Sequence, residues 1–317
     1  MKLNDIKHIG IIGTGMIGAS LAVLFTGNGY KTTMYAINDQ EAASGRERYD
    51  TYFVDLKEKG LVTESQVKAC TKLLHFTQRY EDISDVDFIF ECVVERLEIK
   101  HAVYAQIEKH CRQVRAIASS TSAISADDLA KGLDTLKDRL LVAHPWNPPH
   151  LVPFVEVLRS EYTADDAEKV LVSVLESVGR KVAVMKKSAP GFIANRLQHA
   201  LYREAVYMVE QGITTPQDID MALKYSFIPR YTSIGIFEHF DYAGLDMILS
   251  IEDYLFPTLC DDTKTQDLVR SKHDAGKLGY KTGEGVLDWS GVDIDAFRKR
   301  ASAPYLQFFN WSLPEEQ

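Results

Sequence analysis

The chain has 317 residues, of which 45% are hydrophobic and 26% are charged, as is typical of a globular protein with about two domains. Its formal net charge of −9 argues against a nucleic-acid partner, which favours a basic surface, but allows a small anionic substrate in a locally basic pocket. No apolar run reaches the ~18 residues of a transmembrane helix, and the start MKLNDIKHIG lacks a signal-peptide pattern, so we expect a cytoplasmic protein without a membrane partner.

The first part of the chain alternates between strand-like and helix-like patterns. Apolar runs of strand type lie at 6–12, 32–36, 73–76, 86–94, 116–119, 140–143, 154–158 and 181–185. Helical patterns between them include 17–27, 97–109, 126–131 and 164–178. Several strands are apolar on both faces, which is typical of a sheet covered by helices on both sides. We therefore predict that residues 1–188 form an α/β domain, a Rossmann-type doubly wound parallel sheet.

From about residue 189 the pattern becomes mainly helical. Apolar residues over 192–211 recur at spacings near 3.6 and end before Gly212. Thr215-Pro216-Gln217-Asp218 is a typical helix start, with Thr at the N-cap and Pro at the first helical position. Residues 189–317 are thus predicted to form a smaller, all-helical domain.

The sequence GTGMIG at 13–18 joins the first predicted strand to the first predicted helix. Gly13 permits a tight turn, Gly15 lets a pyrophosphate approach the backbone, and Gly18 lets the helix pack closely on the strand. The helix N-terminus presents free N–H groups and its positive dipole end to the phosphates. We predict that this loop, including Met16 and Ile17, binds a dinucleotide cofactor.

The next strand ends at Ala36, where such folds usually carry an acid that binds the adenine ribose. Asp39 follows three positions later, and Arg46 and Arg48 lie on the next predicted helix. Without the acid, discrimination against a 2′-phosphate weakens. We predict NAD as the cofactor and leave NADP open.

The four cysteines, Cys70, Cys92, Cys111 and Cys260, form no CxxC pair and lie near no histidine at metal-ligand spacing. In a chain of this kind such cysteines are typically reduced and buried. We expect no metal site.

Four further stretches contain the polar residues that an active site needs: VVERLEIK (93–100), SSTSAI (119–124), AHPWNPPHLVPFVEV (143–157) and PGFIANRL (190–197). In this order behind the glycine loop, and with FEHFDYAGLD (237–246) and GKLGYKTGEGVLDW (276–289), they resemble the L-3-hydroxyacyl-CoA dehydrogenase family. The resemblance implies an NAD-dependent enzyme of fatty acid metabolism, which interconverts an L-3-hydroxyacyl-CoA substrate and its 3-oxo product by hydride transfer. It also implies a homodimer formed through the helical domain.

The resemblance assigns roles to individual positions. It makes His144 the catalytic acid/base and Glu156 its partner, while Ser122 and Asn195 match residues that contact the 3-oxygen of the substrate. The other matches are Glu95, Lys100 and Ser120 at the cofactor site, and Asn147 in a His-x-x-Asn-Pro turn beside the substrate.

These residue types suit alcohol oxidation. An imidazole titrates near neutral pH and can take the hydroxyl proton as the hydride leaves, and a carboxylate stabilises the imidazolium and fixes its tautomer. Glu156 lies between Val155 and Val157, where an unpaired carboxylate would be costly, so a histidine partner is expected. Ser122 and Asn195 can donate hydrogen bonds to the oxygen as its charge develops.

The substrate is less narrowly defined. NPPH at 147–150 and Pro153 resemble the branch of L-gulonate 3-dehydrogenase (lambda-crystallin) and L-carnitine dehydrogenase, as does RYTSIG at 230–235. Arg230 suits bidentate pairing with a free carboxylate. A small free 3-hydroxy acid, resembling gulonate, carnitine or 3-hydroxybutyrate, is therefore the alternative to a CoA thioester, which the 276–289 stretch favours. A structural, crystallin-like role is a third reading, and the intact set of four catalytic candidates argues against it.

Overall fold

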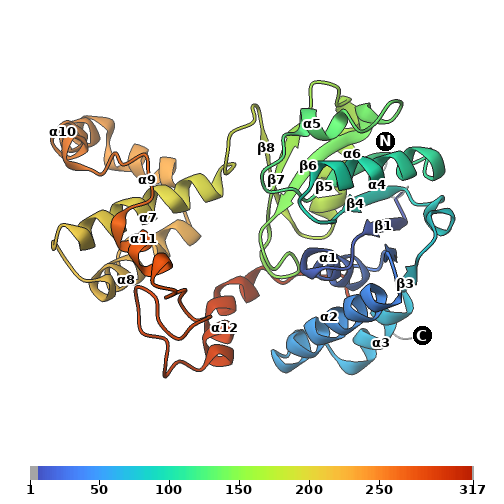
Figure 1. Ribbon diagram of the computed structural model, residues 1–317, viewed down its shortest axis with the longest axis horizontal. Coiled ribbons are helices and arrows are strands. Elements are labelled where there is room, and N and C mark those ends of the chain that lie inside the picture. Colours follow the sequence, from blue (N-terminus) through green and yellow to red (C-terminus); the bar gives the residue numbers. More distant parts are fainter. Residues whose placement is uncertain (1–5, 316–317) are drawn as a thin grey trace. The chain divides into compact units, whose positions relative to one another are not determined.

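The computed structural model describes residues 6–315, and these residues form two units (Figure 1). The α/β unit contains the described residues up to Phe192 together with those from Arg300 onward. The helical unit spans Ile193–Lys299. The predicted boundary at 188/189 lies four positions before this division.

The α/β unit is built on one eight-stranded sheet in the order β3-β2-β1-β4-β5-β6-β7-β8. Its strands are β1 His8–Ile12, β2 Lys31–Tyr35, β3 Leu74–Thr77, β4 Phe88–Glu91, β5 Ala116–Ser119, β6 Leu140–Pro145, β7 Phe154–Arg159 and β8 Lys181–Met185. All eight correspond to predicted strands, and the predicted fold class is confirmed. The first six strands are parallel, whereas β7 runs antiparallel to β6 and β8 runs parallel to β7. The strand order reverses between β1 and β4, and such a reversal creates a crevice at the carboxyl ends of the strands.

Helices cover both faces of this sheet. They are α1 Met16–Gly27, α2 Asp39–Glu58, α3 Glu64–Lys72, α4 Leu97–His110, α5 Ala126–Ala130 and α6 Asp165–Ser177. One buried cluster packs α1, α2, α3 and α6 against the face that includes Phe88 and Phe90, and a second packs α4 and α5 against the face that includes Ile89. Successive strand residues point to opposite faces, so both faces need apolar side chains.

The helical unit contains α7 Ala194–Glu210, α8 Pro216–Tyr225, α9 Ile236–Ala243, α10 Leu245–Leu255 and α11 Asp267–Asp274, and α12 Ile294–Ser302 crosses the division. The predicted start of α8 is confirmed, because the Thr215 side chain accepts a hydrogen bond from the Asp218 N–H and Pro216 is the first helical residue. Among the described residues of 193–299, only Val206 and Cys260 are buried hydrophobic residues.

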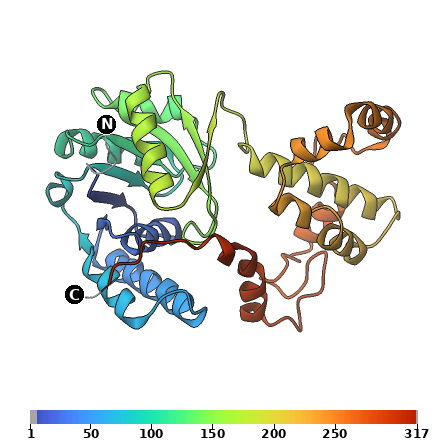
Figure 2. The ribbon, with the colours of Figure 1, turned by 180° about the vertical axis from the view of Figure 1, so that it is seen from behind.

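The C-terminal segment returns to the α/β unit, although the sequence placed it with the helical domain (Figure 2). The Trp311 ring lies directly on Gly27 at the end of α1, where an added Cβ would come 2.4 Å from Trp311 Cε3. The Ser312 N–H donates to Asn28 Oδ1 at 3.2 Å. Residues 300–315 therefore differ from the predicted 189–317 domain because their apolar side chains pack on α1.

Candidate active site

The glycine loop has the geometry of a phosphate-binding turn. Gly13 has φ +109°, and a Cβ there would lie 2.6 Å from the Cys92 carbonyl oxygen. A Cβ on Gly18 would lie 2.1 Å from the Gly13 carbonyl oxygen. A Cβ on Gly15 would meet no described atom within 4 Å, and Gly15 caps α1 without a side-chain hydrogen bond. The open side of the loop thus presents the first N–H groups of α1, which suits a pyrophosphate.

The first residues of α1 differ in exposure. Met16 is 60% exposed and Ile17 is half-buried, packed against the first apolar cluster. The backbone here suits a pyrophosphate, and the Met16 side chain is free to contact the rest of a dinucleotide.

The end of β2 carries no acid at the ribose position. Ala36 is buried at 1% exposure, and Asn38 accepts the Glu41 N–H as the cap of α2. Asp39 accepts a hydrogen bond from Gln78. Arg48 Nη1 lies 3.4 Å from the Thr14 carbonyl oxygen, so this guanidinium reaches the glycine loop.

His144 and Glu156 face each other across two neighbouring strands. β6 and β7 pair in an antiparallel register that sets these two residues directly opposite. His144 Nδ1 lies 2.9 Å from Glu156 Oε2, and the residues are 9% and 1% exposed. Trp146 Nε1 donates to the same oxygen at 3.3 Å, and the Phe192 ring centroid lies 5.1 Å from that of His144. With Nδ1–H directed at the carboxylate, Nε2 is the nitrogen that can take or give a proton.

The proline-rich loop between these strands is held by more than its prolines. Arg180 is 3% exposed, and its Nη1 donates to the carbonyl oxygens of Pro149 at 2.9 Å and Val152 at 3.2 Å. His150 Nδ1 lies 2.7 Å from Ser20 Oγ, which also accepts the His150 N–H at 3.0 Å. Burial, together with the charge of Arg180, lowers the pKa of His150 to about 3. These contacts fix the loop to α1 and to the start of β8.

The sequence predicted neither the Arg180 contacts nor the Ser20–His150 contact that hold this loop. Arg180 carried no distinctive signal, since charged residues commonly border apolar strands, as the neighbouring Lys181 does. Asn147 is exposed in this loop, where the resemblance placed a substrate contact.

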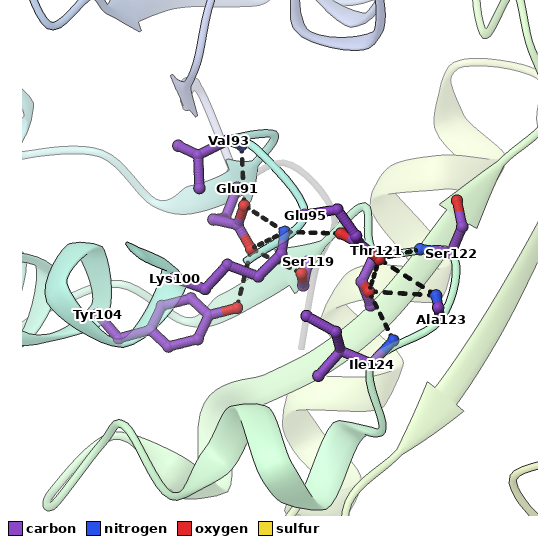
Figure 3. A network of polar contacts seen from close by, with 10 residues as sticks. All are labelled: Glu91, Val93, Glu95, Lys100, Tyr104, Ser119, Thr121, Ser122, Ala123 and Ile124. Atoms are coloured by element: carbon purple, nitrogen blue, oxygen red, sulfur yellow. Dashed lines mark hydrogen bonds and ion pairs between the residues drawn. The ribbon is translucent and has the colours of Figure 1, made fainter. Parts of the chain in front are cut away.

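A second polar network lies at the ends of β4 and β5 (Figure 3). Glu91 and Lys100 are both 0% exposed, and Lys100 Nζ lies 2.8 Å from Glu91 Oε1. Glu91 Oε2 accepts hydrogen bonds from Ser119 Oγ at 2.6 Å and from the Tyr104 hydroxyl at 2.9 Å. Glu91 was not predicted as a site residue, although a carboxylate inside the apolar run FIFECVV carried the same signal as Glu156.

Glu95 joins this network to the loop after β5. Its Oε2 lies 3.4 Å from Lys100 Nζ, while its Oε1 accepts the Thr121 hydroxyl, the Ser122 N–H at 2.9 Å and the Ala123 N–H at 3.2 Å. Partial burial raises the pKa of Glu95, but the Thr121 hydroxyl and Lys100 outweigh it and hold the pKa below its usual value. The structure thus brings together three predicted site residues, Glu95, Lys100 and Ser122.

The neighbouring Ser120 is half-buried and donates its N–H to the Glu91 carbonyl oxygen at 2.9 Å. This bond extends the pairing of β4 with β5 by one residue. Ser120 therefore lies beside Thr121 at the carboxyl end of the sheet, the edge that carries the glycine loop.

Two predicted site residues belong to the helical unit. Asn195 is the second residue of α7 and is half-buried. Arg230 is exposed in the short 3₁₀ helix Pro229–Thr232, and its Nη1 lies 2.8 Å from His239 Nε2. Arg230 therefore has a histidine neighbour and no carboxylate partner among the described residues.

The described residues contain no group of three or more His, Cys, Asp or Glu side chains that could hold a metal ion. Across residues 6–315, we also find no helix with the length and apolar character needed to cross a membrane. All four cysteines are free thiols.

Comparison with protein families matches nearly the whole chain. The family described as "3-hydroxyacyl-CoA dehydrogenase, NAD binding domain" matches residues 8–188. The one described as "3-hydroxyacyl-CoA dehydrogenase, C-terminal domain" matches residues 191–289.

Several named relatives are similar to this chain over most of their length. The chain is 31% identical to a 5-formyl-3-hydroxy-2-methylpyridine 4-carboxylate 5-dehydrogenase of Mesorhizobium japonicum, covering 92% of this chain and 94% of that one. A solved structure of an enzyme with this activity, described as an NAD+-dependent dismutase, superposes with a TM-score of 0.83 at 29% identity, covering 95% of this chain and 97% of the other. A probable 3-hydroxybutyryl-CoA dehydrogenase of Bacillus subtilis is 29% identical over 90% of this chain and 98% of its own. An L-carnitine dehydrogenase of Oceanobacillus iheyensis is 34% identical over 75% of this chain and 76% of its own.

Proposed function

Since the chain belongs to the 3-hydroxyacyl-CoA dehydrogenase family and binds NAD, we propose that it oxidises the secondary alcohol of an L-3-hydroxyacyl-CoA substrate to the 3-oxo product, and catalyses the reverse reduction. The observation that carries the proposal is the buried His144–Glu156 pair, with Nδ1 and Oε2 2.9 Å apart. A histidine held in this way by a carboxylate has one nitrogen left for proton transfer.

In the proposed reaction, His144 takes the hydroxyl proton of the substrate at Nε2 during oxidation and returns it during reduction. Glu156 holds the ring orientation through Nδ1 and stabilises the imidazolium. The Trp146 indole N–H holds the same carboxylate oxygen from a second side. NAD supplies the hydride acceptor when it is bound.

The remaining candidates bind and orient the two ligands. Ser122 and Asn195 are proposed to donate hydrogen bonds to the 3-oxygen, and Asn147 to line the substrate site. The cofactor set comprises Gly13, Gly15, Met16, Ile17 and Gly18 at the pyrophosphate, with Glu95, Lys100 and Ser120 at the nicotinamide end. The open space above Gly15 and the uncapped start of α1 support the pyrophosphate assignment.

A small free 3-hydroxy acid is the second candidate substrate. Two of the relatives above are named for substrates without CoA, a pyridine carboxylate and L-carnitine. The exposed guanidinium of Arg230, which has no carboxylate partner among the described residues, suits a substrate carboxylate.

An NADH absorbance assay tests both candidates. The panel contains acetoacetyl-CoA, 3-hydroxybutyrate, L-gulonate, L-carnitine and the pyridine aldehyde, each measured with NAD(H) and NADP(H). Turnover of acetoacetyl-CoA in preference to the free acids supports the thioester proposal. The absence of turnover with every compound would contradict an enzymatic role and favour a structural one.

Arg230→Ala separates the two substrate classes. A large loss of kcat/KM on a free acid, with little change on a CoA thioester, assigns Arg230 to a substrate carboxylate. Arg270→Ala, which removes an exposed arginine from α11 of the same unit, is the matched control. If neither substrate is affected by Arg230→Ala, the carboxylate role is wrong.

We further propose that the protein is a homodimer that associates through its helical unit, and that it works in the reducing cytoplasm. The first part is supported by the exposed apolar side chains of that unit, and the second by the four free thiols.

A further inference from the structure

The carboxylate of Glu91, at the end of β4, gathers donors from three different segments of the chain. Oε1 accepts the Val93 N–H at 2.9 Å and Lys100 Nζ at 2.8 Å. Oε2 accepts the Tyr104 hydroxyl from α4 and the Ser119 hydroxyl from the end of β5. Figure 3 shows these side chains converging on one carboxylate. Glu91 therefore links the start of α4 to the carboxyl ends of β4 and β5.

A fully buried ion pair contributes little net stability to a protein. Both charges lose their hydration, and well-packed apolar residues of similar volume often give an equally stable protein. Here Glu91 and Lys100 have no exposed surface at all. The pair is better explained by what it holds in place.

What it holds is Glu95, which is 41% exposed. Lys100 reaches Glu95 Oε2 at 3.4 Å, and Glu95 Oε1 accepts the backbone N–H groups of Ser122 and Ala123. The buried carboxylate thus fixes the ammonium, the ammonium fixes the exposed carboxylate, and that carboxylate fixes the loop that carries Ser122.

We infer that Glu91 is a positioning residue, which acts through Lys100 and Glu95 to hold the 121–123 loop so that Ser122 meets the reacting oxygen. The inference rests on the proposed function in its catalytic part, since Ser122 is proposed there to contact the substrate. The structural part, that Glu91 controls the order of the loop, stands on the contacts alone.

Two variants weaken the interactions of the Glu91 carboxylate without replacing a proposed ligand-binding residue. Glu91→Gln removes the charge. Ser119→Ala/Tyr104→Phe removes both hydroxyl donors from Oε2 and leaves every charge in place, so it serves if Glu91→Gln fails to fold. The matched control, Tyr49→Phe/Ser177→Ala, also removes one tyrosine and one serine hydroxyl from the α/β unit, where these groups bond Thr26 and Tyr30.

Hydrogen–deuterium exchange of the 119–126 segment tests the structural part without any activity. In the wild type the Ser122 and Ala123 amides are bonded to Glu95, so their exchange is slowed. Exchange should accelerate about tenfold in the network variants and stay unchanged in the control. Unchanged exchange in a folded network variant overturns the inference.

Kinetics test the catalytic part on the holoenzyme. A misplaced loop should lower kcat about tenfold to hundredfold, while the control keeps the wild-type kcat. The Kd for NADH, measured by fluorescence, should change by a smaller factor than kcat, because the variants keep the Glu95 and Lys100 side chains. Faster exchange with normal kcat, or a kcat loss matched by weaker NADH binding, overturns the positioning role. If the wild type turns over no substrate in the panel, the proposed function fails, and the exchange result still decides the structural part.

Discussion

The two units of this chain differ in how far their apolar side chains are buried. In the α/β unit, side chains such as Phe25, Phe88 and Phe90 are completely buried between the sheet and its helices. In the helical unit, Phe237 is 84% exposed and Tyr242 is 91% exposed. The sheet gives its helices a surface on which to pack, whereas the helical unit builds amphipathic helices whose apolar faces its own residues do not cover.

From this difference we infer which unit suits chemistry and which unit suits association. A unit with its own core can hold side chains in a fixed geometry, as it does for the buried His144–Glu156 and Glu91–Lys100 pairs, and this suits the catalytic and positioning roles proposed for them. A unit with uncovered apolar faces is suited to association, since large exposed apolar patches mark interaction surfaces. We therefore expect variants of the α/β unit to change chemistry or stability, and variants of the helical unit to change assembly.

The largest expected effect is on chemistry, from His144→Ala. Without the group proposed to take the hydroxyl proton, kcat/KM should fall about 10²- to 10⁴-fold in the NADH assay. Sedimentation should show the same oligomeric state as the wild type, because His144 lies in the α/β unit. His273→Ala, which removes an exposed histidine from α11, is the control and should keep full activity. Residual activity near the wild-type level would remove His144 from the mechanism.

The second effect is on assembly, from a charge placed on an exposed apolar helix. Phe237→Glu on α9 puts a carboxylate where the partner in the proposed homodimer would bury an aromatic ring, and should raise the Kd of that dimer about a hundredfold or more. Sedimentation over a dilution series measures this. Tyr162→Glu, at a 41% exposed aromatic of the α/β unit, should leave the Kd unchanged. A wild type that sediments only as a monomer, near 35.7 kDa, would contradict the assigned role of the helical unit.

The third effect compares the two units through their tryptophans. Trp311 is 8% exposed against α1, so Trp311→Ala should lower the free energy of unfolding of the α/β unit by about 3 kcal/mol. Trp289 is half-buried in the helical unit beside Tyr280 and Phe297, so Trp289→Ala should cost less. Urea denaturation of both variants checks the order. A loss for Trp311→Ala no larger than that for Trp289→Ala would contradict this order.

The same contrast explains how much the sequence alone could predict. Apolar runs predicted all eight strands, and the family resemblance named His144 and Glu156 as a pair, which the β6–β7 register sets face to face. The reversed direction of β7 and β8 was not predicted, because an apolar run has the same pattern in either direction.

Contacts between segments distant in the chain were the part that could not be predicted. Arg180 binds loop carbonyls about thirty positions away, and Trp311 packs on Gly27. A backbone carbonyl, or a glycine outside a motif such as GTGMIG, leaves no distinctive pattern in a sequence, so a partner of this kind is found only in the fold. Glu91 is the exception, since a carboxylate in an apolar strand signals a buried partner even when the partner is unknown.

The smallest effect is the loss of stability over the first pH unit below 6.5, and it should be confined to the α/β unit. The pKa of His150 is about 3 in the folded state, against 6.5 for an exposed histidine, because burial disfavours its charged form. Below pH 6.5 the unfolded chain therefore binds a proton that the folded chain excludes. The free energy of unfolding should fall by about 1 kcal/mol for each pH unit between 6.5 and 3 through this group.

His150→Asn removes this titration while its side-chain oxygen can still accept the Ser20 hydroxyl. Urea denaturation at a series of pH values should then show a shallower loss of stability toward acid than in the wild type. His75→Asn, at an exposed position of β3, should leave the wild-type slope unchanged. Hydrogen exchange locates the effect: acid should loosen α1 and residues 146–153 in the wild type, and loosen them less in His150→Asn. An acid response of equal size in α7 would show that the pH dependence arises outside the His150 contact and belongs to both units.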